Sequence, residues 1–302
     1  PENCNTGHKN HDEMSGVGDA IYKTVCPKCG AIRQDSQIGL EQTPEDYVKE
    51  MVKVFSLVRD CLTDDGTLWL NIGDSYYNYR SDGNYPKQTV SKTRQDLPTS
   101  TPVRGNKLEG LKQKDLIGIP WMLAFALRAD GWYLRQDIIW HKPNPMPESV
   151  KDRCTKAHEY IFLLSKSKNY YYDNEAIKEP AKDWGTRDRT NGKYHNPGSG
   201  LAPHSGLTKS YATKNKRSVW SVTVKPYKGA HFATYPEDLV EPCILAGSEK
   251  GDIVLDPFMG SGTTAMVAKK NSRSYLGCEL REEYASLQTA RISTIPNKLP
   301  LY

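Results

Sequence analysis

Residues 252–265 constrain the fold of this chain more than any other stretch of its sequence. An apolar run typical of a buried strand ends at an acid and passes through two glycines into a segment with helical character. Glycines leave the backbone bare, and the start of a helix offers N–H groups that have no acceptor inside the helix. We therefore expect a ligand-binding turn in the string Asp252-Ile253-Val254-Leu255-Asp256-Pro257-Phe258-Met259-Gly260-Ser261-Gly262-Thr263-Thr264-Ala265.

Helical and strand-like patterns alternate through the rest of the chain. Apolar residues recur at helical spacing after Thr43, a residue suited to an N-cap. Alternation of this kind predicts an α/β fold with a mostly parallel sheet, helices on both faces, and a ligand beyond the carboxyl ends of the strands. The predicted helices are 44–62, 115–129, 236–245, 263–270 and 281–292, and the predicted strands are 67–72, 132–140, 159–165, 218–225, 253–255 and 274–279.

Charge is concentrated in one part of this 302-residue chain. The whole chain has 41 Lys or Arg, 36 Asp or Glu, and a net charge of +5, whereas residues 178–228 alone have a net charge of +8. A basic segment of this kind suits a polyanionic partner. Residues 75–113, by contrast, are polar and lack periodicity, which predicts a long loop insertion.

Neither a membrane-spanning apolar run nor a signal-peptide pattern occurs in the sequence. Seven cysteines, an odd number, favour reduced thiols over a disulfide framework. We therefore expect a cytoplasmic protein that has no membrane partner.

Residues 1–36 contain a candidate zinc knuckle. Cys26 and Cys29 have CxxC spacing, and Cys4 and His8 can complete a tetrahedral site, with His11 as the substitute for His8. A structural zinc ion would replace the missing apolar core of this segment. The alternative is an irregular arm with free thiols, and a redox pair is disfavoured because no strand leads into the motif.

Four sequence blocks resemble the S-adenosylmethionine-dependent DNA methyltransferases that modify the amino group of adenine or cytosine. The resemblance covers nearly the whole chain, in the order in which the cofactor loop follows the DNA-recognition region. It implies a class I methyltransferase-like (Rossmann-like) sheet. The blocks are Trp140–Ser149, His158–Phe162, Lys225–Pro236 (including His231-Phe232-Ala233-Thr234-Tyr235-Pro236) and Asp256–Thr264.

The resemblance assigns S-adenosylmethionine to the glycine turn. A carboxylate can accept hydrogen bonds from a ribose diol, and Glu279 follows the next strand at the right place to do so. Residues 231–236 resemble the family's motif that closes over the methionine end of the cofactor. The alternatives are that Glu279 only favours a helix N-terminus and that residues 231–236 form an edge turn. The cofactor-binding residues implied are Asp256, Phe258, Gly260, Gly262, Thr263, Glu279, Phe232 and Thr234.

The family's catalytic tetrapeptide, Asp- or Ser-Pro-Pro followed by an aromatic residue, is absent, since the sequence has no Pro-Pro pair. In relatives it lies on a central strand upstream of a block like residues 37–41. We therefore expect no catalytic residue in this chain, and expect the tetrapeptide upstream of Pro1 in a longer protein.

Two groups of residues are assigned to the nucleic acid. Trp140, Lys142 and Asn144 line the pocket for a base flipped out of the duplex, although Trp140 suits the core equally well. Lys and Arg side chains of a target-recognition region contact phosphates of duplex DNA, unless this region is only a solvated basic loop. The chosen residues are Arg187, Arg189, Lys193, Lys214, Lys216 and Arg217.

The predicted domains are a knuckle or insert (1–36), the first part of the α/β domain (37–177), the target-recognition region (178–225) and the cofactor-binding part (226–302). The predicted function is transfer of a methyl group from S-adenosylmethionine to adenine or cytosine in DNA. Alternatives are an RNA methyltransferase, a non-catalytic DNA- or cofactor-binding relative, and a nicotinamide dehydrogenase, which the missing GxGxxG disfavours. A restriction endonuclease partner, the target sequence and the choice between monomer and homodimer stay open.

Overall fold

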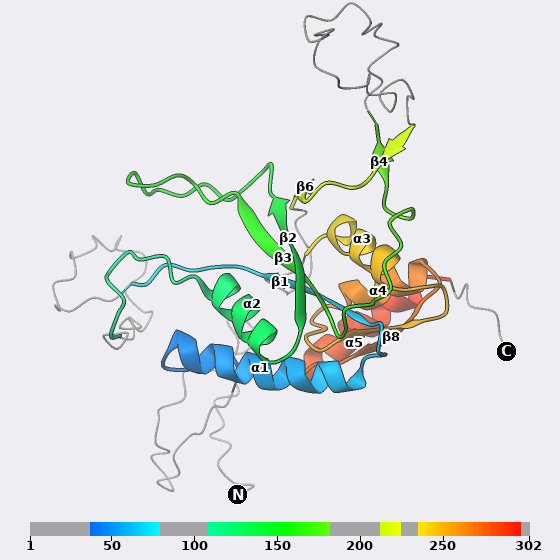
Figure 1. Cartoon of the computed structure of the whole chain (residues 1–302), viewed down its shortest axis with the longest axis horizontal. Helices are drawn as coiled ribbons and strands as arrows, with labels where there is room; N and C mark the ends of the chain where they lie inside the picture. Colours follow the sequence, from blue (N-terminus) through cyan, green and yellow to red (C-terminus); the bar gives the residue numbers. More distant parts are fainter. Residues whose placement is uncertain (1–36, 79–107, 182–211, 225–234, 297–302) are drawn as a thin grey trace, which may run out of the picture.

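The computed structural model describes residues 37–78, 108–181, 212–224 and 235–296 (Figure 1). Within these ranges, helices and strands follow the predicted order. The helices are α1 (Pro44–Cys61), α2 (Ile119–Ala129), α3 (Glu237–Gly247), α4 (Thr263–Lys270) and α5 (Glu282–Ser293). The strands are β1 (Thr67–Ile72), β2 (Tyr133–His141), β3 (His158–Ser165), β4 (Glu179–Pro180), β5 (Thr213–Lys214), β6 (Val219–Ser221), β7 (Ile253–Asp256) and β8 (Ser274–Gly277).

Helices α1 and α2 each start where a side chain accepts hydrogen bonds from free N–H groups at the first turn. The Thr43 hydroxyl accepts the Asp46 N–H at 3.1 Å, which confirms the predicted N-cap. Helix α2 begins at Ile119, four residues later than predicted, because Gly118 is left-handed with φ +85°. The Asp74 carboxylate, just beyond β1, accepts the N–H groups of Gly118 and Ile119 at 3.0 and 3.1 Å and so caps this helix.

The larger sheet has four strands in the order β1-β3-β2-β6. Strand β3 lies antiparallel between β1 and β2, and β6 runs parallel to β2. Strands β1, β2 and β6 therefore share one direction. Strand β6 spans three residues, which is shorter than the predicted 218–225.

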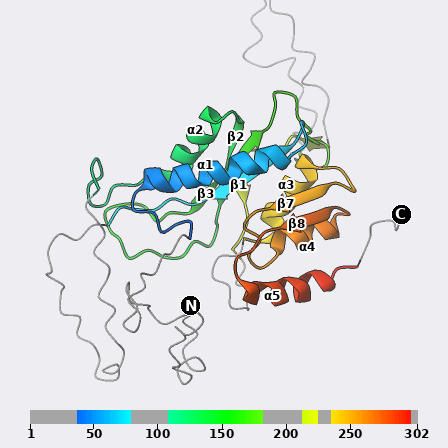
Figure 2. The same ribbon diagram turned by 90° about the horizontal axis from the view of Figure 1, so that it is seen from below.

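Helices cover both faces of this sheet, as Figure 2 shows. On one face, Phe55 of α1 and Leu123 of α2 pack against Leu70 and Phe162. On the other face, Leu239 of α3 joins a core formed by Ile138, Trp140, Ile161 and Trp220. The sheet is thus the middle of three layers, as expected for an α/β domain.

Strands β7 and β8 form a separate parallel pair in the same layer. Leu255 packs against the α1 and α2 core, whereas the adjacent Val254 packs against α3 and α4. Among the described strands, β7 pairs only with β8 and β1 pairs only with β3.

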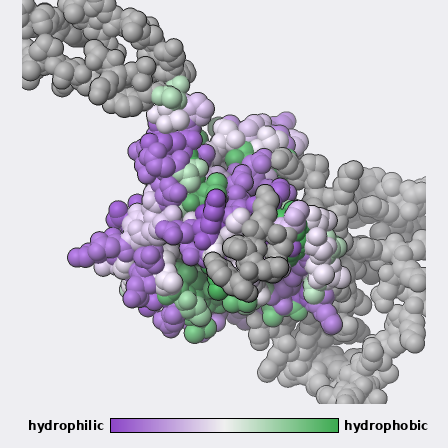
Figure 3. Space-filling model, turned by 90° about the vertical axis from the view of Figure 1, so that its right-hand side faces the viewer, coloured by the Kyte–Doolittle hydropathy of each residue, from purple (hydrophilic) through white to green (hydrophobic). Residues whose placement is uncertain are grey.

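Figure 3 shows a mainly hydrophilic face with smaller hydrophobic areas, a pattern that is normal for a surface in water. In the described ranges, no helix combines the length and the apolar character needed to cross a membrane. The predicted zinc ligands Cys4, His8, Cys26 and Cys29 lie outside those ranges. Within them, no three His, Cys, Asp or Glu residues are grouped so that they could bind a metal ion. Zinc therefore stays a prediction.

Candidate active site

The turn between β7 and α4 has the backbone that a bound ligand requires. Gly260 and Gly262 have φ angles of +49° and +79°, in the region that side-chain-bearing residues rarely adopt. Gly262 is the N-cap of α4, and no side chain caps the helix there. The first N–H groups of α4 therefore have no acceptor within the helix and can face a ligand.

Asp256, the acid that ends β7, is held by both of its carboxylate oxygens. Its Oδ1 accepts the Phe258 N–H at 3.0 Å. Its Oδ2 accepts the Thr264 hydroxyl at 2.5 Å and the Tyr235 hydroxyl at 3.0 Å. The carboxylate thus lies in a defined orientation at the carboxyl end of the strand, where the sequence predicted a ligand.

Glu279 lies beside this turn, two residues beyond β8. One carboxylate oxygen accepts the Gly260 N–H at 2.9 Å, and the other accepts the Arg281 N–H at 2.9 Å. The side chain is exposed. A carboxylate offers about four acceptor positions, so Glu279 can still accept from a diol while it holds the turn.

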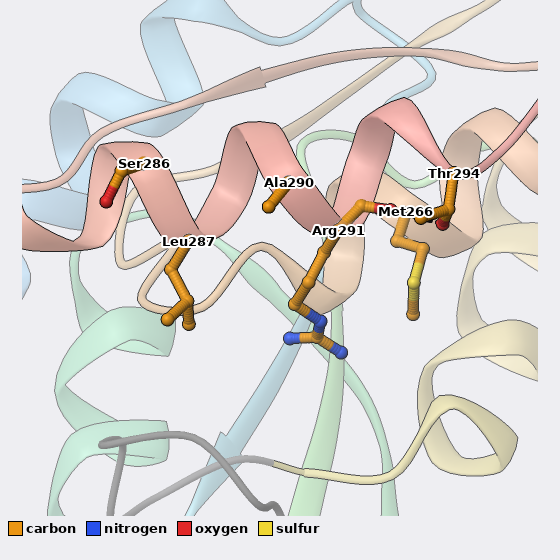
Figure 4. Close-up of a pocket in the computed structure, with 6 residues that line it drawn as sticks. All are labelled: Met266, Ser286, Leu287, Ala290, Arg291 and Thr294. Carbon is orange, nitrogen blue, oxygen red and sulfur yellow. Dashed lines mark hydrogen bonds between the residues drawn. The ribbon is translucent and has the colours of Figure 1, made fainter.

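Side chains of helix α5 form hydrogen bonds to the glycine turn (Figure 4). Gln288 Nε2 donates to the Gly260 carbonyl at 2.7 Å. The Arg291 guanidinium donates to the Ser261 carbonyl at 2.9 Å and to the Thr263 hydroxyl at 3.2 Å. The Thr263 side chain therefore faces α5, and only its backbone remains available for the predicted contact with the cofactor.

A hollow of about 520 Å³ lies between α4 and α5. Its lining residues are Met266, Ser286, Leu287, Ala290, Arg291 and Thr294. Neither Asp256 nor Glu279 lines it, so the polar groups of the glycine turn do not face this space. The hollow is therefore separate from the two acids beside the glycine turn.

Phe258 completes the described part of the turn. Its side chain is 49% exposed, and its ring lies edge-on to Phe55, with 6.4 Å between the ring centroids. An exposed aromatic face next to the glycines can pack against a flat ligand. Phe232 and Thr234, predicted to close over the cofactor, lie outside the described residues.

A second polar cluster gathers at the carboxyl ends of β1 and β2. Lys142 forms an ion pair with Glu159, and its Nζ lies 4.3 Å from the centre of the Trp140 ring. Asn71 Nδ2 lies 3.3 Å from Glu159 Oε2 and donates to the Tyr160 carbonyl at 3.0 Å. Three neighbouring strands thus bring donors and an acceptor to one edge of the sheet.

Two of the three residues predicted to line the base pocket have structural roles here. Trp140 is 3% exposed, and its Nε1 donates to the Val222 carbonyl at 2.8 Å. It therefore belongs to the core, where it packs in one cluster with Trp220 and Leu239. Asn144 bonds to both backbone polar groups of Val224, each at 3.0 Å. For Lys142, the base pocket stays a prediction.

The predicted DNA-binding residues fall into two groups. Arg187, Arg189 and Lys193 lie outside the described residues. Lys214 and Arg217 both pair with Glu179, at 3.3 and 2.6 Å, across the β4–β5 ladder. Burial acts to raise the pKa of Glu179, but hydrogen bonds from Arg217 and Lys214 outweigh it and lower that pKa. Lys216 instead lies 5.0 Å from the Trp220 ring centre.

Several residues that shape these clusters were not predicted from the sequence. Tyr235 and Glu159 lie inside the family-like blocks, but neither was assigned a role of its own. Gln288 and Arg291 are three residues apart on α5, a spacing that puts both on one helix face. In the sequence, the two residues look like part of an ordinary polar helix face. Only their hydrogen bonds to the glycine turn, seen in the structure, reveal a role in the site.

This chain is similar to known methyltransferases over most of its length. The family model described as "DNA methylase" matches residues 11–290. The type II methyltransferase M.SmaI of Serratia marcescens is 49% identical over 290 residues, covering 93% of this chain and 87% of that protein. The type II methyltransferase M.Cfr9I of Citrobacter freundii is 46% identical, covering 85% of this chain and 75% of that protein.

Solved structures show the same fold at lower identity. The cytosine-N4-specific PvuII DNA methyltransferase has a TM-score of 0.56 and 17% identity, covering 89% of this chain and 77% of that one. A putative DNA modification methylase of Thermus thermophilus, complexed with S-adenosyl-L-methionine, has a TM-score of 0.52 and 21% identity. It covers 87% of this chain and 84% of that one.

Proposed function

Because this chain belongs to the DNA methylase family, we propose that it is a methyltransferase that modifies the exocyclic amino nitrogen of adenine or cytosine in DNA. The observation that carries the proposal is the turn at the ends of β7 and β8. There, two carboxylates, Asp256 and Glu279, flank glycines in left-handed conformations and the uncapped start of α4.

These residues fit S-adenosylmethionine, a nucleoside with a positively charged sulfur and an amino-acid tail. When bound, it supplies a methyl group on a good leaving group. The negative charge of Asp256 complements the positive charge of the methionine part. Glu279 accepts from the ribose hydroxyls, and the glycines let the backbone approach closely.

The protein then has to align the methyl group with a base removed from the duplex. We assign Lys142, with Glu159 and Asn71, to one wall of the base pocket. An ammonium group can donate to the ring nitrogen of adenine or to the ring nitrogen and carbonyl of cytosine. No residue of this sequence is assigned to draw on the amino hydrogens, since the Pro-Pro pair of the family's tetrapeptide does not occur in it.

Around this site we assign the basic residues of the 178–225 region to the phosphates of duplex DNA. A restriction endonuclease partner is also proposed, since M.SmaI and M.Cfr9I are both called type II methyltransferases. A cytoplasmic location follows from the proposed DNA substrate.

Binding is the first test, and it needs only this chain. Equilibrium dialysis should show saturable binding of labelled S-adenosylmethionine that unlabelled S-adenosylhomocysteine displaces and NAD does not. The Asp256→Asn variant should bind more weakly. If NAD displaced the labelled S-adenosylmethionine and S-adenosylhomocysteine did not, the methyltransferase proposal would be wrong.

Transfer of the methyl group to nucleic acid is the second test. Labelled methyl groups should enter duplex DNA, and digestion to nucleosides should identify N6-methyladenine or N4-methylcytosine. Incorporation into RNA but not DNA would support the RNA alternative. No transfer to either, with cofactor binding intact, would favour a non-catalytic relative.

A further inference from the structure

The hydroxyl group of Tyr235 joins three elements of the fold at one point. Tyr235 lies two residues before α3, Asp256 ends β7, and Thr264 is in the first turn of α4. The Tyr235 hydroxyl lies 3.0 Å from Asp256 Oδ2 and 2.5 Å from Thr264 Oγ1. Thr264 Oγ1 itself lies 2.5 Å from the same carboxylate oxygen. Two hydroxyl groups thus converge on one oxygen of the acid that ends β7.

Packing fixes the position of this phenol. The partly buried ring of Tyr235 packs against the core formed by α3 and the larger sheet, which includes Leu239 and Trp220. Burial, followed by the nearby charge of Asp256, raises the pKa of Tyr235 above its ordinary value. The phenol therefore keeps its proton near neutral pH and donates to the carboxylate. A hydrogen bond to an ionised acceptor is roughly twice as strong as one between neutral groups.

We infer that Tyr235 is a positioning residue for the cofactor loop, which orients the Asp256 carboxylate and ties it to the first turn of α4. This inference rests on the proposed binding of S-adenosylmethionine at the glycine turn. The second oxygen, Oδ1, accepts the Phe258 N–H, so the orientation of one carboxylate also sets the path of the loop backbone. A carboxylate held by its own chain loses little freedom when a ligand binds, and such preorganisation strengthens binding.

The test is a double-mutant cycle, with S-adenosylmethionine binding measured by isothermal titration calorimetry and folding by thermal unfolding. Tyr235→Phe keeps the ring and removes the hydroxyl. It should raise the Kd roughly tenfold or more, as expected for loss of a hydrogen bond to a charged group. Tyr172→Phe is the control, because it removes the hydroxyl of an exposed tyrosine whose ring stacks on Trp69 of β1. It should leave the Kd unchanged.

If Tyr235 only stabilised the fold, Tyr235→Phe would lower the unfolding temperature, and its effect on the Kd would be the same with or without the Asp256 carboxylate. In the Asp256→Asn background, adding Tyr235→Phe should change the Kd less than about twofold, because the shared carboxylate is already altered. Thr264→Val should weaken binding, and Thr264→Ser, which keeps the hydroxyl, should restore it.

Two outcomes would overturn the inference: a Tyr235→Phe variant that binds like the unaltered protein, or effects of Tyr235→Phe and Asp256→Asn that simply add. If the unaltered protein itself does not bind S-adenosylmethionine, the proposed function fails first, and the two failures are distinguishable in one experiment.

Discussion

Asn144 and Val224 are 80 residues apart in the chain and share two hydrogen bonds. Asn144 Nδ2 donates to the Val224 carbonyl, and Asn144 Oδ1 accepts the Val224 N–H, each at 3.0 Å. The amide therefore extends the β2–β6 pairing beyond Ser221, the last residue of β6. Its two polar groups match the N–H and C=O of a single residue, a pattern that a neighbouring strand would otherwise supply.

Asn144→Ala should loosen the segment around Val224. The loss of two hydrogen bonds is worth about 1–3 kcal/mol of local stability. Hydrogen exchange of the Val224 amide should speed up, with little change in exchange at β1. If Asn144 instead contacted the base, exchange at Val224 would stay the same while methyl transfer fell.

Glu279→Gln should weaken S-adenosylmethionine binding by roughly ten- to hundredfold, because it removes a charged acceptor from the turn and from the proposed ribose contact. Fluorescence or calorimetric titration measures the effect. Glu282→Gln, an exposed acid at the start of α5, is the matched control and should bind normally. Equal effects of both variants would indicate that only general charge near the turn matters.

Gly277→Ala should disturb the turn by steric contact. A Cβ atom on Gly277 would lie 1.8 Å from Met259 Sδ and 3.0 Å from Met259 Cβ, so the buried Met259 would have to move. Overpacking of this kind costs about 1–3 kcal/mol, visible as a lower Tm, and should weaken cofactor binding. Gly73→Ala, where the nearest atom is at 3.7 Å, should change cofactor binding little.

Lys216→Gln should reduce the affinity for DNA more than Lys214→Gln. Lys214 shares the Glu179 carboxylate with Arg217, whereas Lys216 lies over an aromatic ring. The slope of log K against log salt concentration is negative, and losing one phosphate contact should reduce its magnitude by about 0.9. Binding titrations at several salt concentrations measure this slope. An unchanged slope in the Lys216 variant would remove this residue from the DNA interface.

The four described cysteines should differ sharply in reactivity. Cys61, Cys154 and Cys278 are exposed, whereas burial raises the pKa of the Cys243 thiol to about 12. A raised pKa makes the reactive thiolate rarer at about pH 8, so Cys243 should react slowly. Mass spectrometry after brief alkylation should find the first three modified and Cys243 modified only after unfolding. Rapid labelling of folded Cys243 would contradict its burial.

Local chemistry made much of the fold predictable. Thr43 caps α1 as expected, because a hydroxyl at that position accepts a free helix N–H whatever the tertiary structure. The start of α2 was missed, because Asp74 captures its first N–H groups from 44 and 45 residues away. Strand β6 was predicted too long, since the alternating pattern continues past Ser221 to Val224, which is paired by the Asn144 side chain and not by a strand.

The sequence by itself determined the glycine turn, the two acids beside it and the family to which they point, because these depend on residue type and on short spacing. Only the tertiary structure decided which polar groups meet. It turns Thr263 toward Arg291 and Thr264 toward Asp256, buries Trp140, and brings Tyr235 to the acid that ends β7. Such contacts depend on how helices pack against the sheet, and a hydrogen bond requires a distance that no spacing along the chain encodes.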